Sequence, residues 1–162
     1  MGTTAENVAK KFNISRNEQQ EFAIISHSKA NEAQKNGSLT KEIIPIGNCN
    51  MDGNIRPNST QEKLDSLKLA FDPNGTVTAA TSSPLTDGAA ATLICEENYA
   101  KENNLDILGR IISTAVEGCN PDYMGLGPIG ATKKALSRAN LSIDKIDIFE
   151  LNEAFACLLY TS

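Results

Sequence analysis

The sequence predicts an α/β fold that follows a mainly helical N-terminal segment. Residues 76–156 alternate short apolar runs, typical of strands, with stretches of helical spacing. The N-terminal third instead carries helix-start signals. With 162 residues, 40% hydrophobic and 22% charged, the chain is long enough and apolar enough to bury a core as a single domain.

Two capping boxes predict where the first helices begin. In each box, a Ser or Thr and the Glu three positions later satisfy each other's free backbone N–H groups. Thr3 with Glu6 is the first pair and Ser15 with Glu18 is the second. The second helix has a face of small side chains and ends at Gly37. The small residues of this face are Ala23, Ser26, Ala30 and Ala33.

Turn-forming residues divide the rest of the chain into short elements. Residues 47–60 are rich in Asn, Gly and Pro and predict an exposed loop, whereas residues 71–75 predict a turn. Pro128, at a first helical position, opens the last long helix. Asn152 is expected to begin a further helix. The expected strands are 42–46, 76–81, 89–95, 108–116 and 146–151, and the remaining helices are 60–69, 96–103 and 128–139.

Composition and charge exclude several classes of protein. A net charge of −5 and 5% aromatic residues provide no basic stripe for nucleic acid. The longest apolar run is about six residues, far too short to span a membrane, and the polar N-terminus argues against a secretory signal. Four cysteines without a Cys-x-x-Cys pair, and a single histidine, argue against structural zinc and favour reduced thiols in an intracellular protein.

Two features look like functional motifs but have simpler structural interpretations. Gly125, Gly127 and Gly130 spell Gly-x-Gly-x-x-Gly, yet a dinucleotide site needs a strand that runs straight into the glycines, and Pro128 removes one phosphate-binding N–H. A tight turn onto a helix explains these glycines. His27 could act as a general base, but no partner stands at a convincing spacing, so we expect an ordinary surface or interface histidine.

Five segments together are more specific than any one motif. They are MGTTAENVA (1–9), SRNEQQEFA (15–23), FDPNGTVTAATSSPLTDGAAA (71–91), MGLGPIGATKKAL (124–136) and IDIFELNEAFA (146–156). In this order they resemble the thiolases, the acetyl-CoA acyltransferases that cleave or form 3-ketoacyl-CoA. Three shorter stretches look closer to degradative 3-ketoacyl-CoA thiolases than to short-chain enzymes. These stretches are 42–45, 55–57 and 81–83.

The resemblance implies part of the layered αβαβα thiolase fold, with a mainly helical inserted loop domain. Residues 1–70 would form that loop domain on the CoA-binding side. Residues 71–151 would be the later part of the N-terminal domain, and residues 152–156 the start of the C-terminal domain. Residues 157–162 look like one translated frame of a transposase adapter, so we expect a non-native tail; an ordinary apolar helix start is the alternative.

The resemblance also implies roles for individual residues. Asn152 would hold a water that donates to the thioester oxygen, or it would simply cap a helix. Ser83 would bind the pantetheine arm, or serve as a turn serine. Arg56 would pack near the CoA adenine, or act as a solubilising charge. Thr81 stands where many relatives carry Asn, which leaves the local hydrogen bonding open. The other matched positions are Ala79 and Leu85 along the pantetheine arm, and Met1, Ala154 and Phe155 near the acyl end.

The motifs with which thiolases do covalent chemistry do not occur in these 162 residues. The family uses a cysteine in Cys-x-Ser-Gly, a histidine in Gly-His-Pro and a second cysteine before a Gly-Gly pair. Neither His27 nor any cysteine of this chain matches those positions. We therefore expect the chain by itself to be inactive. The parent would be a ping-pong acyltransferase that needs no metal or prosthetic group.

The resemblance further implies partners and surroundings. CoA and acyl-CoA would be the substrates. The parent would be a homodimer or a dimer of dimers, with or without a hydratase/dehydrogenase subunit, in the bacterial cytoplasm or in a mitochondrion or peroxisome. Three other functions stay open: a non-catalytic acyl-CoA-binding or sterol-carrier-like relative, a short-chain acetyl-CoA acetyltransferase, and an unrelated helical interaction module.

Overall fold

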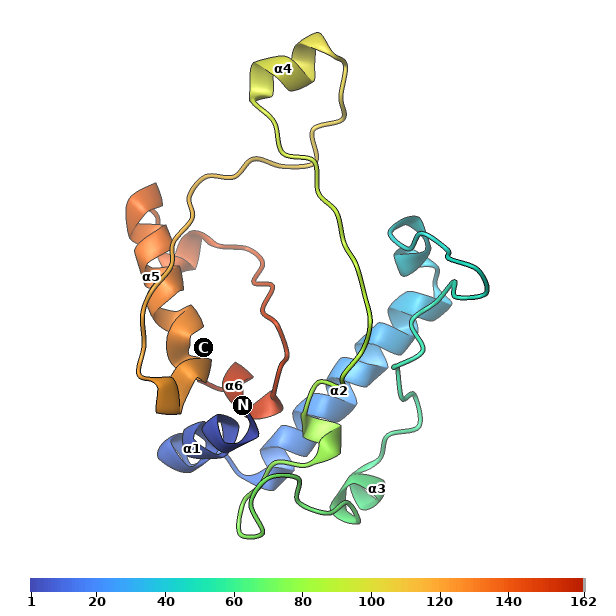
Figure 1. Ribbon diagram of the computed structural model, residues 1–162, viewed down its shortest axis with the longest axis vertical. Helices are drawn as coiled ribbons and strands as arrows, with labels where there is room; N and C mark the ends of the chain where they lie inside the picture. The colour runs from blue at the N-terminus through green and yellow to red at the C-terminus, as the bar shows by residue number, and fades with distance from the viewer. Residues whose placement is uncertain (162) are drawn as a thin grey trace.

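The computed structural model describes residues 1–161 and places long extended segments on a helical base (Figure 1). The short helix α6 (Ala156–Leu159) packs against both α1 (Gly2–Phe12) and α2 (Arg16–Lys35), so the two ends of the chain lie close together. α3 (Gln61–Asp65) packs on α2, and α4 (Glu97–Glu102) lies at the far end of the molecule. The remaining elements are α5 (Gly127–Ala139) and the 3₁₀ helices η1 (Ser38–Lys41), η2 (Ala79–Thr81), η3 (Pro121–Leu126) and η4 (Ile143–Lys145).

The second capping box is confirmed. The Ser15 hydroxyl accepts the backbone N–H of Glu18 at 3.2 Å, and the Glu18 carboxylate accepts the backbone N–H of Ser15 at 2.7 Å. At the other end, α2 stops at Lys35 and Gly37 follows with φ +79°, a left-handed conformation that glycine adopts without strain. The longest helix of the chain is therefore bounded where the sequence predicts.

The first capping box is wrong, and its Glu6 has another role. α1 already begins at Gly2, so Thr3 lies within the helix and Met1 is the N-cap residue. The buried Glu6 carboxylate accepts the backbone N–H groups of Thr76 and Val77, each at 2.9 Å. A Cβ atom on Gly75 would overlap this carboxylate, so only glycine permits the approach. Glu6 thus fixes the turn before residues 76–84 to α1.

A small buried core holds the base together. It joins α1, the turn after α1, the start of residues 76–84 and the residues around α6. The Phe71 ring packs edge-to-face against the buried Phe155 ring at a centroid distance of 6.0 Å. The core residues are Ala5, Ala9, Ile14, Val77, Phe155 and Cys157.

The expected strands do not form within residues 1–161. These residues contain only isolated antiparallel bridges, namely Ile46 with Cys49, Leu69 with Thr78 and Ser82 with Phe155. The strand predictions for 42–46, 76–81, 89–95, 108–116 and 146–151 are therefore wrong for this chain. A strand needs a neighbour to take its backbone hydrogen bonds. Among the described residues, the extended segments form no ladder of such hydrogen bonds with one another.

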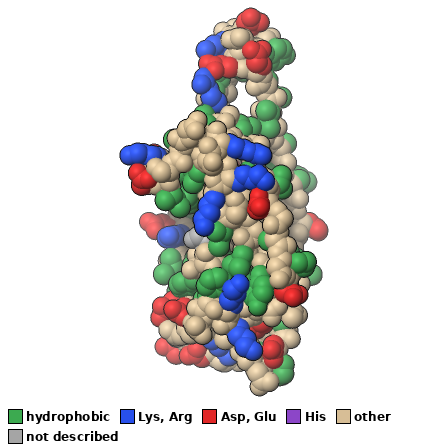
Figure 2. Space-filling view, turned by 90° about the vertical axis from the view of Figure 1, so that its left-hand side faces the viewer, with side chains coloured by type: hydrophobic (Ala, Val, Ile, Leu, Met, Phe, Trp, Pro, Cys, Tyr) green, Lys and Arg blue, Asp and Glu red, His purple; other side chains and the backbone are tan. Residues whose placement is uncertain are grey.

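The same segments leave apolar side chains uncovered. Leu108 is 98% exposed and Ile148 is 84% exposed. Figure 2 shows hydrophobic side chains open along one face of the molecule. Extended apolar surface on a soluble domain marks a face that another element or another chain covers. Among the described residues, no helix is both long enough and apolar enough to cross a membrane.

The Gly-x-Gly-x-x-Gly segment is a turn onto a helix, as expected. It leads from η3 into α5, and Pro128 is the second residue of that helix. A Cβ atom on Gly125 would overlap the Leu158 side chain, and one on Gly130 would crowd Glu117. These two glycines therefore permit close packing between segments.

Candidate functional site

Two adjoining cavities form a continuous groove along α2. The smaller cavity, of about 210 Å³, lies between α2, residues 80–84 and residues 152–156. The larger cavity, of about 560 Å³, lies between residues 79–84, the loop 54–59 and α3. Both cavities are lined by His27, Ala80, Ser82 and Pro84, so they meet at these residues.

Polar side chains of α2 fix both sides of the groove. The Gln19 amide donates to the Thr76 hydroxyl at 2.9 Å, which holds the start of residues 76–84. The Gln20 amide oxygen accepts from Gln61 at 2.5 Å, which holds α3. The Arg16 guanidinium donates to three carbonyl oxygens at the end of α3, the closest at 2.8 Å. These carbonyls would otherwise lack partners at a helix C-terminus.

Residues 78–81 close into a turn through their own side chains. The Thr81 hydroxyl accepts the backbone N–H of Thr78 at 3.0 Å and lies within 3.3 Å of the Thr78 carbonyl oxygen. Both threonines are buried. Thr81 therefore satisfies the backbone hydrogen bonding that the sequence left open.

The residues after this turn bring Asn152 into the smaller cavity. The backbone N–H of Ser83 donates to the carbonyl oxygen of Ala154 at 2.9 Å, and Ser82 forms a bridge with Phe155. Asn152 and Ser83 consequently line the same cavity. α6 begins only at Ala156, with Phe155 as its N-cap. The expected helix start at Asn152 and the capping alternative for its side chain are therefore wrong.

The larger cavity is cationic although the chain as a whole carries a net charge of −5. Arg56 and Lys63 line it, and no acidic residue in the described part of the chain does. The backbone N–H of Arg56 donates to Nδ1 of His27 at 3.2 Å, so a neutral His27 ring carries its proton on Nε2. Lys63 Nζ donates to the carbonyl oxygen of Asn58 at 2.8 Å. This end of the groove favours an anionic group.

Four of the eight site residues implied by the resemblance lie together in the groove. Asn152 and Ser83 line the smaller cavity, and Arg56 and Ala79 line the larger one. The other four do not line either cavity. Met1 is 72% exposed, Leu85 is fully exposed, Phe155 is buried in the core and Ala154 packs against that core. The roles of all eight residues remain predictions.

Most residues of the groove were not predicted as site residues from the sequence, and they include Ser26, His27, Lys63 and Glu153. Ser26 and His27 lie on the small-residue side of α2, Lys63 lies on α3, and Glu153 follows Asn152. The hydrogen-bond partner of His27 is a backbone N–H 29 positions away, which no spacing rule reveals. The only sequence feature that pointed to Ser26 was its place among small residues at helical spacing on α2.

No cysteine lines the groove as far as residues 1–161 show. Cys49, Cys95 and Cys119 are exposed, whereas Cys157 is fully buried. Burial raises the pKa of the Cys157 thiol to about 11, and the nearby Glu6 carboxylate adds to the rise. Because the thiolate is the reactive form, this thiol is a poor nucleophile at neutral pH.

The chain matches two thiolase family models. The model of the thiolase N-terminal domain matches residues 1–98, and that of the C-terminal domain matches residues 105–162. The junction between them falls inside the segment 71–151 that the sequence analysis assigns to one domain. The predicted domain boundaries, after residues 70 and 151, stay a prediction.

Curated relatives share about half of the residues of this chain. The 3-ketoacyl-CoA thiolase of Idiomarina loihiensis is 51% identical over 166 aligned residues, and that of Aliivibrio salmonicida is 52% identical. In both cases the match covers 96% of this chain and 43% of the relative. The chain thus spans less than half the length of the relatives it matches.

Solved thiolase structures have the same backbone fold as this chain. Human mitochondrial 3-ketoacyl-CoA thiolase is 38% identical, with a TM-score of 0.95 over 99% of this chain and 42% of its own. The Bacillus anthracis acetyl-CoA acetyltransferase is 39% identical, with a TM-score of 0.93 over 99% of this chain and 43% of its own. These matches confirm the predicted α/β thiolase fold, although the extended segments here lack strand partners.

Proposed function

The chain belongs to the thiolase family, and we propose that it is part of a 3-ketoacyl-CoA thiolase. One observation carries the proposal: a single groove joins Asn152 and Ser83 at one end to the cationic Arg56 at the other. A thioester on a long, phosphate-bearing carrier needs a site of this kind, with polar groups at one end and positive charge at the other.

The proposed reaction moves an acyl group from one thiol to another. A cysteine thiolate, supplied by a part of the enzyme that this chain does not contain, attacks the keto carbon of 3-ketoacyl-CoA. The bond between the α and β carbons breaks and acetyl-CoA leaves after protonation. The thiolate of a second CoA then takes the acyl group from the cysteine, which regenerates the enzyme.

This chain contributes binding and electrostatic stabilisation to that reaction. The Asn152 amide holds a water that donates to the thioester oxygen as negative charge develops there. Ser83 hydrogen-bonds the pantetheine arm. Arg56 and Lys63 face the adenine and phosphate end, where a planar guanidinium can both stack and pair with phosphate.

Degradative 3-ketoacyl-CoA thiolase is favoured over short-chain acetyl-CoA acetyltransferase as the parent. The support comes from the curated relatives at 49–52% identity, which are named 3-ketoacyl-CoA thiolase. The solved human 3-ketoacyl-CoA thiolase and the solved acetyltransferase, at 38% and 39% identity, do not separate the two classes. These curated relatives are bacterial, which supports a bacterial cytoplasmic protein that acts on acyl-CoA and CoA. A dimeric parent, with or without a hydratase/dehydrogenase partner, is part of the same proposal.

The test exchanges this chain into a complete enzyme. In the spliced enzyme, residues 1–156 replace the matching span of the Idiomarina loihiensis 3-ketoacyl-CoA thiolase. CoA-dependent loss of 3-ketoacyl-CoA is then measured for a short and a long acyl chain. We expect kcat within about tenfold of the unaltered relative, and no turnover by the 162-residue chain alone.

Two outcomes would contradict the proposal. A spliced enzyme that folds and dimerises like the unaltered relative but does not turn over would show that this segment does not serve a thiolase site. Turnover by the isolated chain above a buffer control would show that it carries a nucleophile of its own. Circular dichroism and gel filtration establish folding in each case.

A further inference from the structure

We propose that Ser26 and Glu153 are positioning residues whose hydrogen bond holds Asn152 in the smaller cavity. The inference rests on the proposed function, because it assigns Asn152 the thioester oxygen. Ser26 lies on α2 and Glu153 lies 127 positions later, directly after Asn152. The Ser26 hydroxyl donates to Glu153 Oε2 at 2.5 Å.

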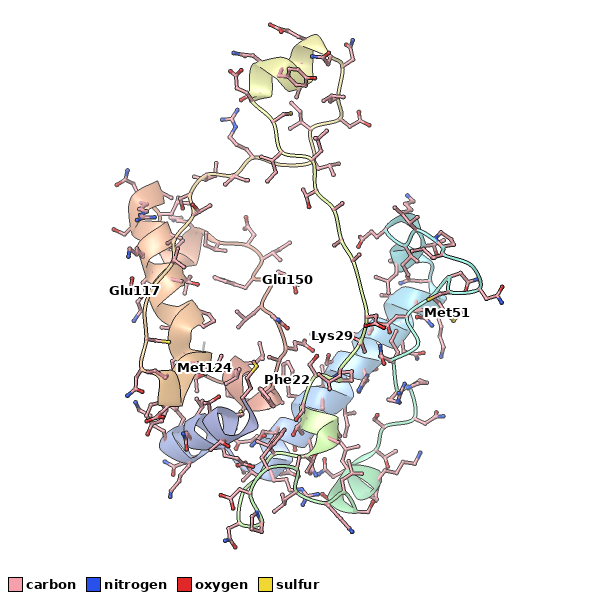
Figure 3. All side chains as sticks on the ribbon, viewed as in Figure 1. Phe22, Lys29, Met51, Glu117, Met124 and Glu150 are labelled. Carbon is pink, nitrogen blue, oxygen red and sulfur yellow. The ribbon has the colours of Figure 1, made fainter. Side chains whose placement is uncertain are left out.

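The segment that carries Asn152 makes few other hydrogen bonds to the rest of the chain. Between η4 and Asn152 the chain runs through extended backbone without a strand partner among the described residues, and Glu150 stands on this open stretch in Figure 3. On the other side, the first backbone contact is the hydrogen bond from Ser83 to Ala154. The side chain of Glu153 therefore provides the contact nearest to Asn152 along the chain.

The same hydrogen bond fixes the direction of the carboxylate that follows Asn152 in the chain. Among the described residues, Glu153 is the only acidic one that lines the smaller cavity. A freely rotating carboxylate at the next position could accept the amide N–H of Asn152, and its charge would oppose the negative charge that develops on a thioester oxygen. With its Oε2 held by Ser26, the carboxylate stays directed toward α2.

Neighbouring contacts make α2 a firm support for this bond. α2 packs against α6 and η2, and Phe22, one turn before Ser26, lies between α2 and α6 (Figure 3). The Phe22 and Tyr160 rings meet at a centroid distance of 6.3 Å, and the Tyr160 hydroxyl donates to the Glu18 carbonyl oxygen at 2.8 Å. A displacement of α2 would therefore also displace Asn152, because Ser26 on α2 is hydrogen-bonded to Glu153.

The test compares two side chains of the same shape in the spliced enzyme. Ser26→Thr keeps a hydroxyl donor, whereas Ser26→Val removes it and keeps the branched shape. We expect Ser26→Val to lower kcat about tenfold with KM nearly unchanged, and Ser26→Thr to keep most of kcat, because small misplacements of a catalytic group lower the rate of the chemical step. Ser28→Val, on an exposed position of the same helix, is the matched control and should keep full activity.

A second pair of variants makes the same comparison without altering α2. Glu153→Gln keeps an oxygen that accepts from Ser26, and Glu153→Leu does not. We expect Gln to keep most of kcat and Leu to lower it about tenfold. Equal kcat values within both pairs would overturn the positioning role. A spliced enzyme that is inactive before any of these changes would instead overturn the proposed function.

Discussion

At the scale of single residues, Asn152 owes its place to its neighbours rather than to its own contacts. Ser26 binds Glu153 and the backbone N–H of Ser83 binds Ala154, the two residues that follow Asn152, and the Asn152 amide does not cap α6. Stability and catalysis are therefore separable at this residue. A side chain that does not satisfy a helix N-terminus can be removed without the usual cost of about 1 kcal/mol.

Asn152→Ala in the spliced enzyme should lower kcat by roughly ten- to a thousandfold, the range for loss of one donor to a developing oxyanion. KM should change less, because the water held by Asn152 matters most when the oxygen carries charge. The melting temperature should stay unchanged. Steady-state kinetics and a thermal melt check both parts; full kcat with a lowered melting temperature would show a purely structural role.

Ser83→Ala should have the opposite kinetic effect. A contact to the pantetheine arm is made equally in the bound substrate and in the transition state, so its loss should raise KM for CoA about three- to tenfold and leave kcat nearly unchanged. The backbone N–H of Ser83, which binds Ala154, is retained in this variant. A fall in kcat with unchanged KM would contradict the assigned role.

Only some of the residues around the groove could be predicted from the sequence. The resemblance placed Asn152, Ser83, Arg56 and Ala79, and all four line the groove. It could not reveal that Ser26 meets Glu153, because a side-chain contact across 127 positions depends on how α2 packs. Leu85 and Met1 were matched to apolar lining, yet both are exposed here. An apolar side chain lines a tunnel only where other elements complete it.

At the scale of secondary-structure elements, helices were predictable and strands were not. Helix signals are local: the capping box at Ser15 and the glycine at 37 suffice to bound α2. Strand formation depends on partners far along the chain. Residues 108–116 have the composition of a strand, but no described segment pairs with them. The box at Thr3 failed because Glu6 binds a turn 70 positions away.

The buried thiol of α6 tests how well this small element is packed. The Cys157 pKa is raised from 9.0 to about 11, so the fold favours the protonated thiol. The protonated Cys157 thiol contributes its full stabilisation of the folded state below pH 9, and this contribution is lost as the pH rises toward 11. At pH 9 the thiolate fraction should be about fiftyfold lower than in the unfolded chain.

We therefore expect iodoacetamide at pH 9 to modify Cys49, Cys95 and Cys119 of the 162-residue chain well before Cys157. Mass spectrometry of the digested chain follows each site, and alkylation in urea serves as the control in which all four should react alike. Equal rates for Cys157 and Cys95 without urea would show that α6 does not pack onto α1 and α2.

At the scale of the whole molecule, the chain divides into a packed base and uncovered extended segments. The base consists of residues 1–84 and 152–161, which contain the core and the groove. Within residues 85–151, η3 packs on α1, but buried side chains are few, and the exposed apolar positions favour association of the isolated chain. We expect the isolated chain to be only partly folded.

Hydrogen exchange of the 162-residue chain should show this division directly. Amides of α2 should exchange at least about a hundredfold more slowly than those of residues 108–116, because only the former have persistent backbone hydrogen bonds. Peptide-resolved mass spectrometry over seconds to hours makes the comparison. Equal protection of 108–116 and α2 in the monomer would show that the extended segments pair in solution.

A crystal structure of the spliced enzyme with CoA tests most directly the claim that the two cavities form one groove for CoA. We expect the sulfur end in the smaller cavity beside Asn152, the pantetheine arm along Ser83 and Ala79, and the adenine and phosphates beside Arg56 and Lys63. CoA bound outside both cavities, or bound with its adenine next to Asn152, would contradict the claim.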